Sequence, residues 1–319
     1  MARQKHVAAG ASGSSQAAPV TAHEAPAVTR RRFLGVAGGI VASLGLITQA
    51  GCADALFSTE LVSSESADSA GNAASATTIR FGCEAAFAPY EWRQDTETEY
   101  TLPVSNAPGT YVDGYDIQLM KLIAEHMDRD PVVIDMSFDG LIAALNAGQF
   151  DALIAGMSAT EERKKSVDFS EPYMKSDIGI FVSKDSPLAN ATSLSDFSGK
   201  SVIAQKGSIQ DDAVDEIPGV NHMDAANSVP DAITRLMQGT VDGVAVDLIN
   251  ANIYESQYPG YVCVRFESGK GFKPHEGACV AVAKGDPMYI LDSINEVIES
   301  ISDDERQKMW DDASSRVPQ

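Results

Sequence analysis

The sequence predicts an α/β fold made of two similar lobes, and two observations carry this prediction. From residue 79 onward, short apolar runs alternate with amphipathic helical segments, which is typical of α/β proteins. The pattern Leu-x-x-Gly-x-x-Asp, followed by an apolar run, occurs at residues 145–151 and again at 236–242, an offset of 91 residues. Either this repeat marks two related lobes or common residues recur by chance.

Length and composition exclude several classes of protein. A chain of 319 residues allows two or three domains, so a single small disulfide-stapled module is excluded. Because 45 acidic residues outnumber 24 basic ones, the net charge is −21, and no nucleic-acid partner is expected. The five histidines are scattered and the four cysteines form no CxxC pair. We therefore expect neither a metal site nor another cofactor.

Residues 1–51 are expected to form an export signal. The string Thr-Arg-Arg-Arg-Phe-Leu at 29–34 resembles a twin-arginine signal, and an apolar stretch follows it to Ala50. Cys52 then matches the lipidated cysteine of a lipoprotein, although Gln49 stands where an aliphatic residue is usual. Cleavage after Ala55 would instead release the protein. Residues 52–78, rich in Ser, Ala and Thr, are expected to be a flexible tether, so the folded part would be extracytoplasmic and membrane-anchored.

The folded part is expected to consist of short strands and helices in alternation. Strands are predicted at 79–83, 152–155, 201–204 and 243–246, and helices at 116–127, 139–145, 230–237 and 248–255. Asp139 can cap the second of these helices, which Gly148 ends, and Thr160 can cap the turn that carries Arg163. If the repeat is real, Gly156 and Asp247 hold equivalent places just beyond their strands. Ligands bind at such strand ends in open α/β sheets, so two facing lobes would place these residues on opposite walls of one cleft.

Six motifs occur in one order along the chain: Phe87-Ala-Pro-Tyr-Glu-Trp92, Gly114-Tyr-Asp-Ile117, Phe138-Asp-Gly-Leu141, Asp151-Ala-Leu-Ile-Ala-Gly-Met-Ser-Ala-Thr-Glu-Glu-Arg163, Val167-Asp-Phe-Ser-Glu-Pro-Tyr173 and Leu194-x-Asp-Phe-x-Gly199. Together they resemble the polar amino-acid branch, family 3, of the extracytoplasmic solute-binding proteins that feed ABC importers. The resemblance covers residues 79 to about 312. It implies a periplasmic-binding-protein-like clamp of type II, with two crossover strands near 173–175 and 276–280. Residues 79–174 and 278–319 would then form lobe 1, and 175–277 lobe 2.

The resemblance also implies a site for a free amino acid. Arg163 would pair with the ligand carboxylate, because a planar guanidinium binds a carboxylate through two hydrogen bonds. Asp247 would face the ammonium group from the other lobe. The two phenylalanines of the site would sandwich the ligand, and the 207–209 turn would present backbone N–H groups to it. The remaining expected ligand-binding residues are Glu84, Phe87, Phe138, Gly156, Ser158, Ser208 and Ile209.

Each of these residues also has a purely structural interpretation. Arg163 could be a solvated member of the charged run 161–165, Phe87 and Phe138 could be core aromatics, and Asp247 could cap the helix after it. Because Glu84 is expected beside the ligand side chain, an ionised carboxylate there favours arginine, lysine or ornithine, with glutamine or another neutral residue second.

Three other functions and one structural question stay open. The fold also serves dehydratases that act on cyclic carboxylic acids, in which Glu84 could be a general acid or base. The second alternative is a sensor that presents its closed state to a membrane receptor. The third is a structural lipoprotein. Cys263 and Cys279 are expected on neighbouring strands near a crossover, where they would be either a disulfide or two buried thiols.

The favoured interpretation is a monomeric binding protein and not an enzyme. Its expected partners are a free amino acid, an ABC permease with its ATPase, and the membrane, which it would meet through the lipid on Cys52.

Overall fold

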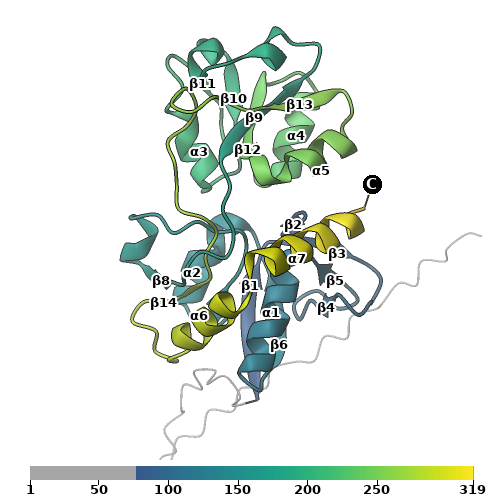
Figure 1. The fold of residues 1–319 in the computed structure, drawn as a ribbon, viewed down its shortest axis with the longest axis vertical. Coiled ribbons are helices and arrows are strands. Elements are labelled where there is room, and N and C mark those ends of the chain that lie inside the picture. Colours follow the sequence, from purple (N-terminus) through teal and green to yellow (C-terminus); the bar gives the residue numbers. More distant parts are fainter. Residues whose placement is uncertain (1–76, 319) are drawn as a thin grey trace, which may run out of the picture. The chain divides into compact units, whose positions relative to one another are not determined.

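The computed structural model describes residues 77–318, whose ribbon is drawn in colour in Figure 1. The export signal predicted for 1–51, the lipidation predicted at Cys52 and most of the tether predicted for 52–78 lie outside the described residues. The described chain contains three β-sheets with helices around them. No helix among residues 77–318 combines the length and the hydropathy needed to cross a bilayer.

The first sheet has five strands in the order β6 (Asp130–Asp135), β1 (Thr78–Cys83), β7 (Ala152–Leu153), β14 (Ala281–Ala283) and β8 (Val167–Phe169). β1 runs parallel to β6 and β7, whereas β14 runs antiparallel to β7 and β8. A small antiparallel sheet accompanies it, ordered β2 (Ala86–Phe87), β3 (Glu91–Gln94), β5 (Tyr111–Asp113) and β4 (Leu102–Pro103). With α1 (Tyr115–His126), α2 (Leu141–Asn146), α6 (Leu291–Ser300) and α7 (Asp303–Arg316), these sheets form the first lobe.

The second sheet repeats the order of the first. It runs β11 (Asn221–His222), β10 (Ser201–Ile203), β12 (Gly243–Asp247), β9 (Ile178–Ser183) and β13 (Tyr261–Val264). β10 is parallel to β11 and β12, and β9 is antiparallel to β12 and β13. With α3 (Ile209–Val214), α4 (Val229–Met237) and α5 (Ala251–Gln257) it forms the second lobe, drawn in green in Figure 1. Apolar side chains cover both faces of this sheet as two separate clusters.

The chain passes between the lobes twice, once from β8 to β9 and once from β13 to β14 (Figure 1). The two passages touch each other, because Met174 and Ala278 form an isolated antiparallel bridge. The α/β class agrees with the sequence. The lobe boundaries expected at 174/175 and 277/278 stay predictions.

The internal repeat corresponds to one structure used twice. In each copy a helix ends in a glycine with a positive φ, 71° in the first and 70° in the second. The aspartate that follows then accepts a hydrogen bond from the backbone of the neighbouring parallel strand. Asp151 Oδ2 accepts from Arg80 N at 2.9 Å, and Asp242 Oδ2 accepts from Ser201 N at 2.8 Å. The Leu-x-x-Gly-x-x-Asp pattern thus ends a helix and fixes the start of the next strand.

Some local expectations are wrong in detail. The helix predicted from Asp139 begins as a 3₁₀ turn, η1 (Phe138–Gly140), and no side-chain capping bond forms there. The Asp139 carboxylate instead pairs with Lys206 of the second lobe, with an N–O distance of 2.7 Å. The helix predicted at 248–255 is divided into a 3₁₀ turn, η5 (Leu248–Asn250), and α5. The cap predicted at Thr160 is confirmed, because its Oγ1 accepts from Arg163 N at 3.2 Å.

The cysteine pair was expected on neighbouring strands, and this expectation is wrong. Cys263 lies on β13 in the second sheet, opposite Phe181, whereas Cys279 N donates to Met157 O in the first lobe. Both are free, buried thiols, as is Cys83. The two residues belong to different lobes because the second passage between the lobes separates them.

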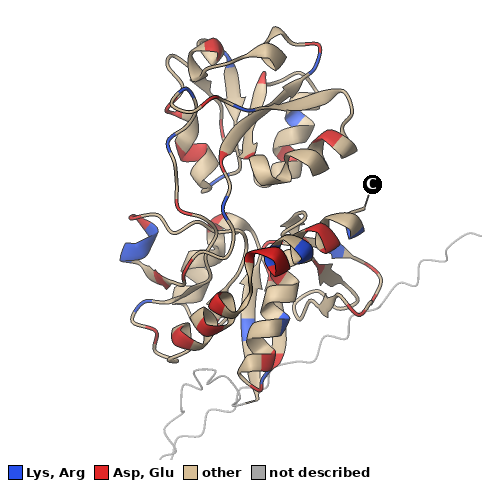
Figure 2. Ribbon diagram, in the orientation of Figure 1, with Lys and Arg blue, Asp and Glu red and all other residues tan. Residues whose placement is uncertain are grey.

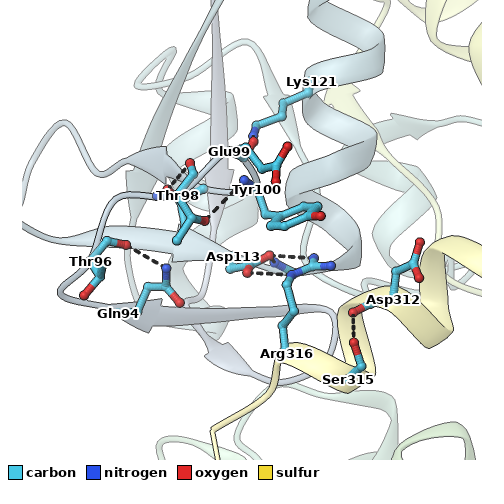
Figure 3. Close-up of polar contacts among 12 residues, drawn as sticks. Gln94, Thr96, Thr98, Glu99, Tyr100, Asp113, Lys121, Asp312, Ser315 and Arg316 are labelled. Atoms are coloured by element: carbon cyan, nitrogen blue, oxygen red, sulfur yellow. Dashed lines mark hydrogen bonds and ion pairs between the residues drawn. The ribbon is translucent and has the colours of Figure 1, made fainter.

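The C-terminal helix α7 is fastened to the first lobe by a buried ion pair. Arg316 Nε and Nη2 donate to the two carboxylate oxygens of Asp113 at 2.9 and 2.8 Å, as Figure 3 shows. The guanidinium also lies over the ring of Tyr100, 4.0 Å from its centroid. Beyond this anchor the chain reaches the second lobe, where Gln257 Nε2 donates to Pro318 O at 2.9 Å.

Acidic side chains prevail on the last two helices. Their acids are Asp292, Glu296 and Glu299 on α6, and Asp303, Asp304, Glu305, Asp311 and Asp312 on α7. Figure 2 shows red segments along both helices. The negative net charge of the sequence is therefore carried in part by the surface of the first lobe.

Candidate functional site

Thirteen residues from both lobes line one small cavity between the two sheets. They are Phe87, Phe138, Gly156, Ser158, Arg163, Gln205, Ser208, Ile209, Gln210, Val229, Ala245, Val246 and Asp247. Eight of the nine ligand-binding residues expected from the sequence are in this set, and only Glu84 is not. The structure thus brings together residues that are up to 160 positions apart in the chain.

Arg163 supplies the positive charge of the first wall. It begins η2 (Arg163–Lys165) in the loop after β7, and its Nη1 donates to Ser158 O at 2.6 Å. Its guanidinium carbon lies 5.7 Å from the centre of the Phe138 ring. Burial lowers the pKa of Arg163 to about 10, which leaves the group charged at neutral pH. The half-buried guanidinium is therefore held in the cavity wall and is not a solvated member of a surface charge run.

Asp247 supplies the negative charge of the second wall. It ends β12 and is 6 % exposed. Its side chain makes no capping hydrogen bond to η5, so the purely structural interpretation of this residue is not observed. Its Oδ1 is buried without a hydrogen-bond partner. Burial raises the pKa of Asp247 to about 6, although His275, Gln210 and Ser176 lower it. A buried carboxylate oxygen that lacks a donor is a ready acceptor for a cation.

Glu84 lies behind the lining residues and makes a bond across the cleft. It follows β1, is 6 % exposed, and its Oε2 accepts from Gln205 Nε2 at 2.6 Å. Burial raises the pKa of Glu84 to about 7, against the hydrogen bond from Gln205, which lowers it. Because Gln205 lines the cavity, Glu84 is one side chain removed from it.

The aromatic and glycine positions shape the first wall. The Phe87 ring stacks on Tyr90 with 5.0 Å between centroids and 10° between planes. Gly156 has a φ of 57°, and a Cβ there would lie 2.9 Å from the Phe87 ring. Only glycine therefore fits at position 156 without moving the aromatic ring. Phe138 is 8 % exposed and borders the same cavity, so both phenylalanines lie at the site as well as in the core.

The turn before α3 forms part of the second wall. Ser208 Oγ donates to Gln205 O at 2.7 Å and accepts from Asp211 N at 3.1 Å, so this serine caps α3. Ser208 N also donates to Gln205 O, at 3.1 Å. Of the N–H groups of the 207–209 turn that we expected to face a carboxylate, the one of Ser208 is thus engaged within the turn in this conformation.

The two walls touch each other directly. Arg163 Nη2 donates to Gly207 O at 2.9 Å, beside the contacts of Glu84 with Gln205 and of Asp139 with Lys206. The cavity left between them measures about 20 Å³, which is room for about one water molecule. A ligand larger than water therefore needs these contacts to open before it can enter.

Sequence reasoning missed five lining residues: Gln205, Gln210, Val229, Ala245 and Val246. A signal for Gln205 was present, because it directly follows the strand predicted at 201–204 and strand ends carry ligand contacts. The apolar residues gave no such signal, since a strand buried on both faces has the same composition wherever it lies.

The arrangement can hold a zwitterion. One wall carries a guanidinium and the other a carboxylate with a free acceptor, and both are desolvated when the walls meet. Among residues 77–318, no group of three or more His, Cys, Asp or Glu side chains is placed to hold a metal ion.

Comparison with known proteins gives consistent results. A model of the bacterial extracellular solute-binding proteins, family 3, matches residues 79–312. A probable histidine-binding protein of Campylobacter jejuni is 26% identical over 251 residues, which cover 78% of this chain and 90% of that protein. The arginine-binding extracellular protein ArtP of Bacillus subtilis is 29% identical over 225 residues, covering 67% and 84%.

A solved structure agrees as well. The substrate-binding protein of an amino acid ABC transporter from Streptococcus pneumoniae, bound to L-arginine, superposes with a TM-score of 0.65 at 27% identity, covering 75% of this chain and 94% of that one. The type II clamp expected from the sequence is thereby confirmed. The relatives are named as binding proteins and not as enzymes, as we expected of this chain.

Proposed function

This chain belongs to family 3 of the bacterial extracellular solute-binding proteins, and from that membership we propose that it binds a free cationic amino acid for an ABC importer. Arginine, lysine and ornithine are the candidate ligands. The single observation that carries the proposal is that two buried carboxyl groups at the cleft lack a charged partner within the described chain. Asp247 Oδ1 has no hydrogen-bond donor, and among residues 77–318 Glu84 accepts its side-chain hydrogen bond from an uncharged amide, Gln205.

In the proposed complex the α-groups of the ligand neutralise Arg163 and Asp247. Arg163 exchanges its bonds to the carbonyl oxygens of Ser158 and Gly207 for the ligand carboxylate. Asp247 Oδ1 receives the ammonium group. Because these two residues come from different lobes, one ligand satisfies both only when the lobes are together, and this difference in affinity drives closure.

The side chain of the ligand would extend toward Glu84. Its cationic end would replace Gln205 Nε2 as the donor to Glu84 Oε2, and Phe87 and Phe138 would flank its aliphatic stem. The net charge of −21 supports a cationic ligand as well, since a negative field raises the encounter rate of cations. Relatives named as histidine-binding and arginine-binding proteins are consistent with this class.

We further propose that the protein is delivered outside the cytoplasm and held there by lipid on Cys52, with lobe 1 and lobe 2 divided at residues 174 and 278. It would act as a monomer that passes its ligand to the permease and ATPase of an importer. Partition of wild type into detergent, and release or arrested processing of Cys52→Ser, would support the anchor. Wild type that is fully soluble in the medium would contradict it.

The ligand class is tested by isothermal titration of the purified protein with the twenty amino acids, ornithine and prephenate. Tightest binding of arginine, lysine or ornithine is expected. Glutamate bound more tightly than arginine and lysine would overturn the cationic assignment, since two carboxylates in one dry site repel each other.

A further inference from the structure

Two carboxyl groups are buried behind the first wall of the cleft, away from any cation. Glu91 on β3 and Asp116 on α1 are each 0 % exposed. Within residues 77–318, neither pairs with Lys, Arg or His. Burial of two unpaired carboxylates costs several kcal/mol each, so the site needs either a counter-charge or a proton.

The backbone holds the two acids together. Asp116 N donates to Tyr90 O and Tyr115 N donates to Pro89 O, both at 2.9 Å. Gly114 makes this approach possible, since a Cβ at that position would lie 2.0 Å from Tyr90 O. Two sequence motifs whose polar residues have no role at the ligand, 87–92 and 114–117, therefore meet at these carboxyl groups.

A count of donors and acceptors decides the protonation state. Asp116 Oδ2 accepts from Gly156 N at 2.9 Å and from Tyr173 Oη at 3.0 Å. With both acids ionised, the other three oxygens, Oδ1 of Asp116 and both oxygens of Glu91, have no donor. One proton on Glu91 supplies a donor to Asp116, removes one buried charge and relieves the repulsion between the two groups.

We propose that Glu91 is a neutral carboxylic acid whose O–H donates a hydrogen bond to Asp116, and that this pair positions the ligand site through Gly156 and Tyr173. The effect of the pair on ligand affinity rests on the proposed function, whereas the protonation of Glu91 does not.

The pair reaches two parts of the clamp through one carboxylate. Gly156 lines the cavity and is kept in a left-handed conformation, so a bond to its N–H fixes the direction of its peptide group. Tyr173 lies at the first passage between the lobes, where its N donates to Ala278 O at 2.8 Å and its O accepts from Arg306 Nη1 at 2.9 Å. Asp116 thus connects the cleft wall to the first passage between the lobes.

The surroundings favour the proton on Glu91. Burial raises the pKa of Glu91 well above its usual range, and the negative charges of Asp116 and Glu84 raise it further. The titratable groups that face the pair are Cys83, Glu84, Tyr90, Tyr115, Asp135 and Tyr173, with Arg306 facing Tyr115. Because the folded state holds a proton that the unfolded chain loses near the ordinary pKa of glutamate, the stability from this group is lost as the pH rises.

Three variants and one spectroscopic measurement test the pair, with exposed Glu99→Gln as the matched control. Glu91→Gln keeps a donor to Asp116, so it should bind arginine within about threefold of wild type. Glu91→Ala removes the donor to Asp116, and Asp116→Asn removes one of the acceptor oxygens of that residue. Each variant should weaken arginine binding by about tenfold or more. Infrared spectra at about pH 8, where Asp247 and Glu84 are largely ionised, should contain a protonated carboxyl band that Glu91→Gln lacks and Glu99→Gln retains.

The outcomes separate this proposal from the proposed function. If wild type binds no amino acid, the ligand assignment fails, yet the infrared band and the pH dependence of unfolding still decide the pair. In Glu91→Gln the free energy of unfolding should also decrease less with rising pH than in wild type. A merely structural role of Glu91 would not predict this difference. A wild-type spectrum without the band, or Glu91→Gln as damaging as Glu91→Ala, would overturn the proposal.

Discussion

Gln205 of the second lobe donates its side-chain amide to Oε2 of Glu84 in the first lobe at 2.6 Å, and both residues are buried. The bond satisfies a desolvated carboxylate with an uncharged donor. A guanidinium or ammonium group is a stronger donor to a carboxylate than an amide is. The contact is therefore one of those that join the two lobes and, under the proposed function, marks the place that a cationic side chain takes.

Glu84→Gln is expected to weaken arginine binding by at least about tenfold, while glutamine binding changes far less. The reason is that the variant loses the charge but keeps a carbonyl acceptor. Titration calorimetry with both ligands measures the ratio, and Glu125→Gln on the exposed surface of α1 is the matched control. Equal losses for the two ligands would mean that Glu84 does not face the ligand side chain.

Arg163→Ala is expected to weaken the native amino acid by about 30-fold to several thousand-fold, because an unpaired ligand carboxylate in a closed site costs about 2 to 5 kcal/mol. Lys165→Ala is the control. Lys165 belongs to the same η2 turn, but it is exposed and pairs with Glu162. Binding by Arg163→Ala within about a factor of three of wild type would remove Arg163 from the site.

The repeated elements and two of the cavity-lining residues could be predicted from local patterns in the sequence, whereas the other expected site residues rested on the family resemblance. Helix ends need a residue that tolerates positive φ, and Gly148 and Gly239 supply it at equivalent places. Strand ends at an open sheet edge collect ligand contacts, which located Gly156 and Asp247. Both signals are local in the chain, so they can be seen without the fold.

The missing parts depend on contacts between distant segments. The small sheet β2–β5 has strands of two to four residues, too short to produce a period in the sequence. The bond between Glu84 and Gln205 spans 121 positions and exists only because the lobes meet. Cys263 and Cys279 were misplaced for the same reason, since nearness in the chain does not reveal that a passage between lobes separates them.

Asp113→Asn is expected to lower the free energy of unfolding by about 3 to 5 kcal/mol, because it leaves the Arg316 guanidinium without its buried partner. The two side chains are 2 % and 19 % exposed and are joined by two hydrogen bonds (Figure 3). Urea unfolding measures the loss. Arg265→Met is the comparison, since its partner Glu255 lies in a far more exposed pair, and about 0 to 1 kcal/mol is expected there. If the two variants lost similar amounts of unfolding free energy, the Arg316–Asp113 pair would stabilise the protein no more than an exposed pair does.

Arginine affinity is expected to rise with pH between about pH 5 and pH 8. Burial raises the pKa of Asp247 to about 6 and that of Glu84 to about 7, so both carboxyls are largely protonated in the ligand-free protein at the acid end of this range. The ammonium and guanidinium groups of the ligand favour the ionised carboxylates. Binding therefore lowers both pKa values and releases protons. For each proton released, the arginine affinity can rise by up to about tenfold per pH unit.

The same shifts act with the opposite sign on the ligand-free fold. A carboxyl whose pKa is raised in the folded state stabilises that state at low pH, and this stability is lost as the pH rises through about 6 to 7. Arginine should thus stabilise the protein more at pH 8 than at pH 5. Calorimetry in two buffers of different ionisation enthalpy counts the released protons, and Glu84→Gln should release fewer than wild type. Proton uptake on binding, or an affinity that does not change with pH, would show that neither carboxylate meets a charged group of the ligand.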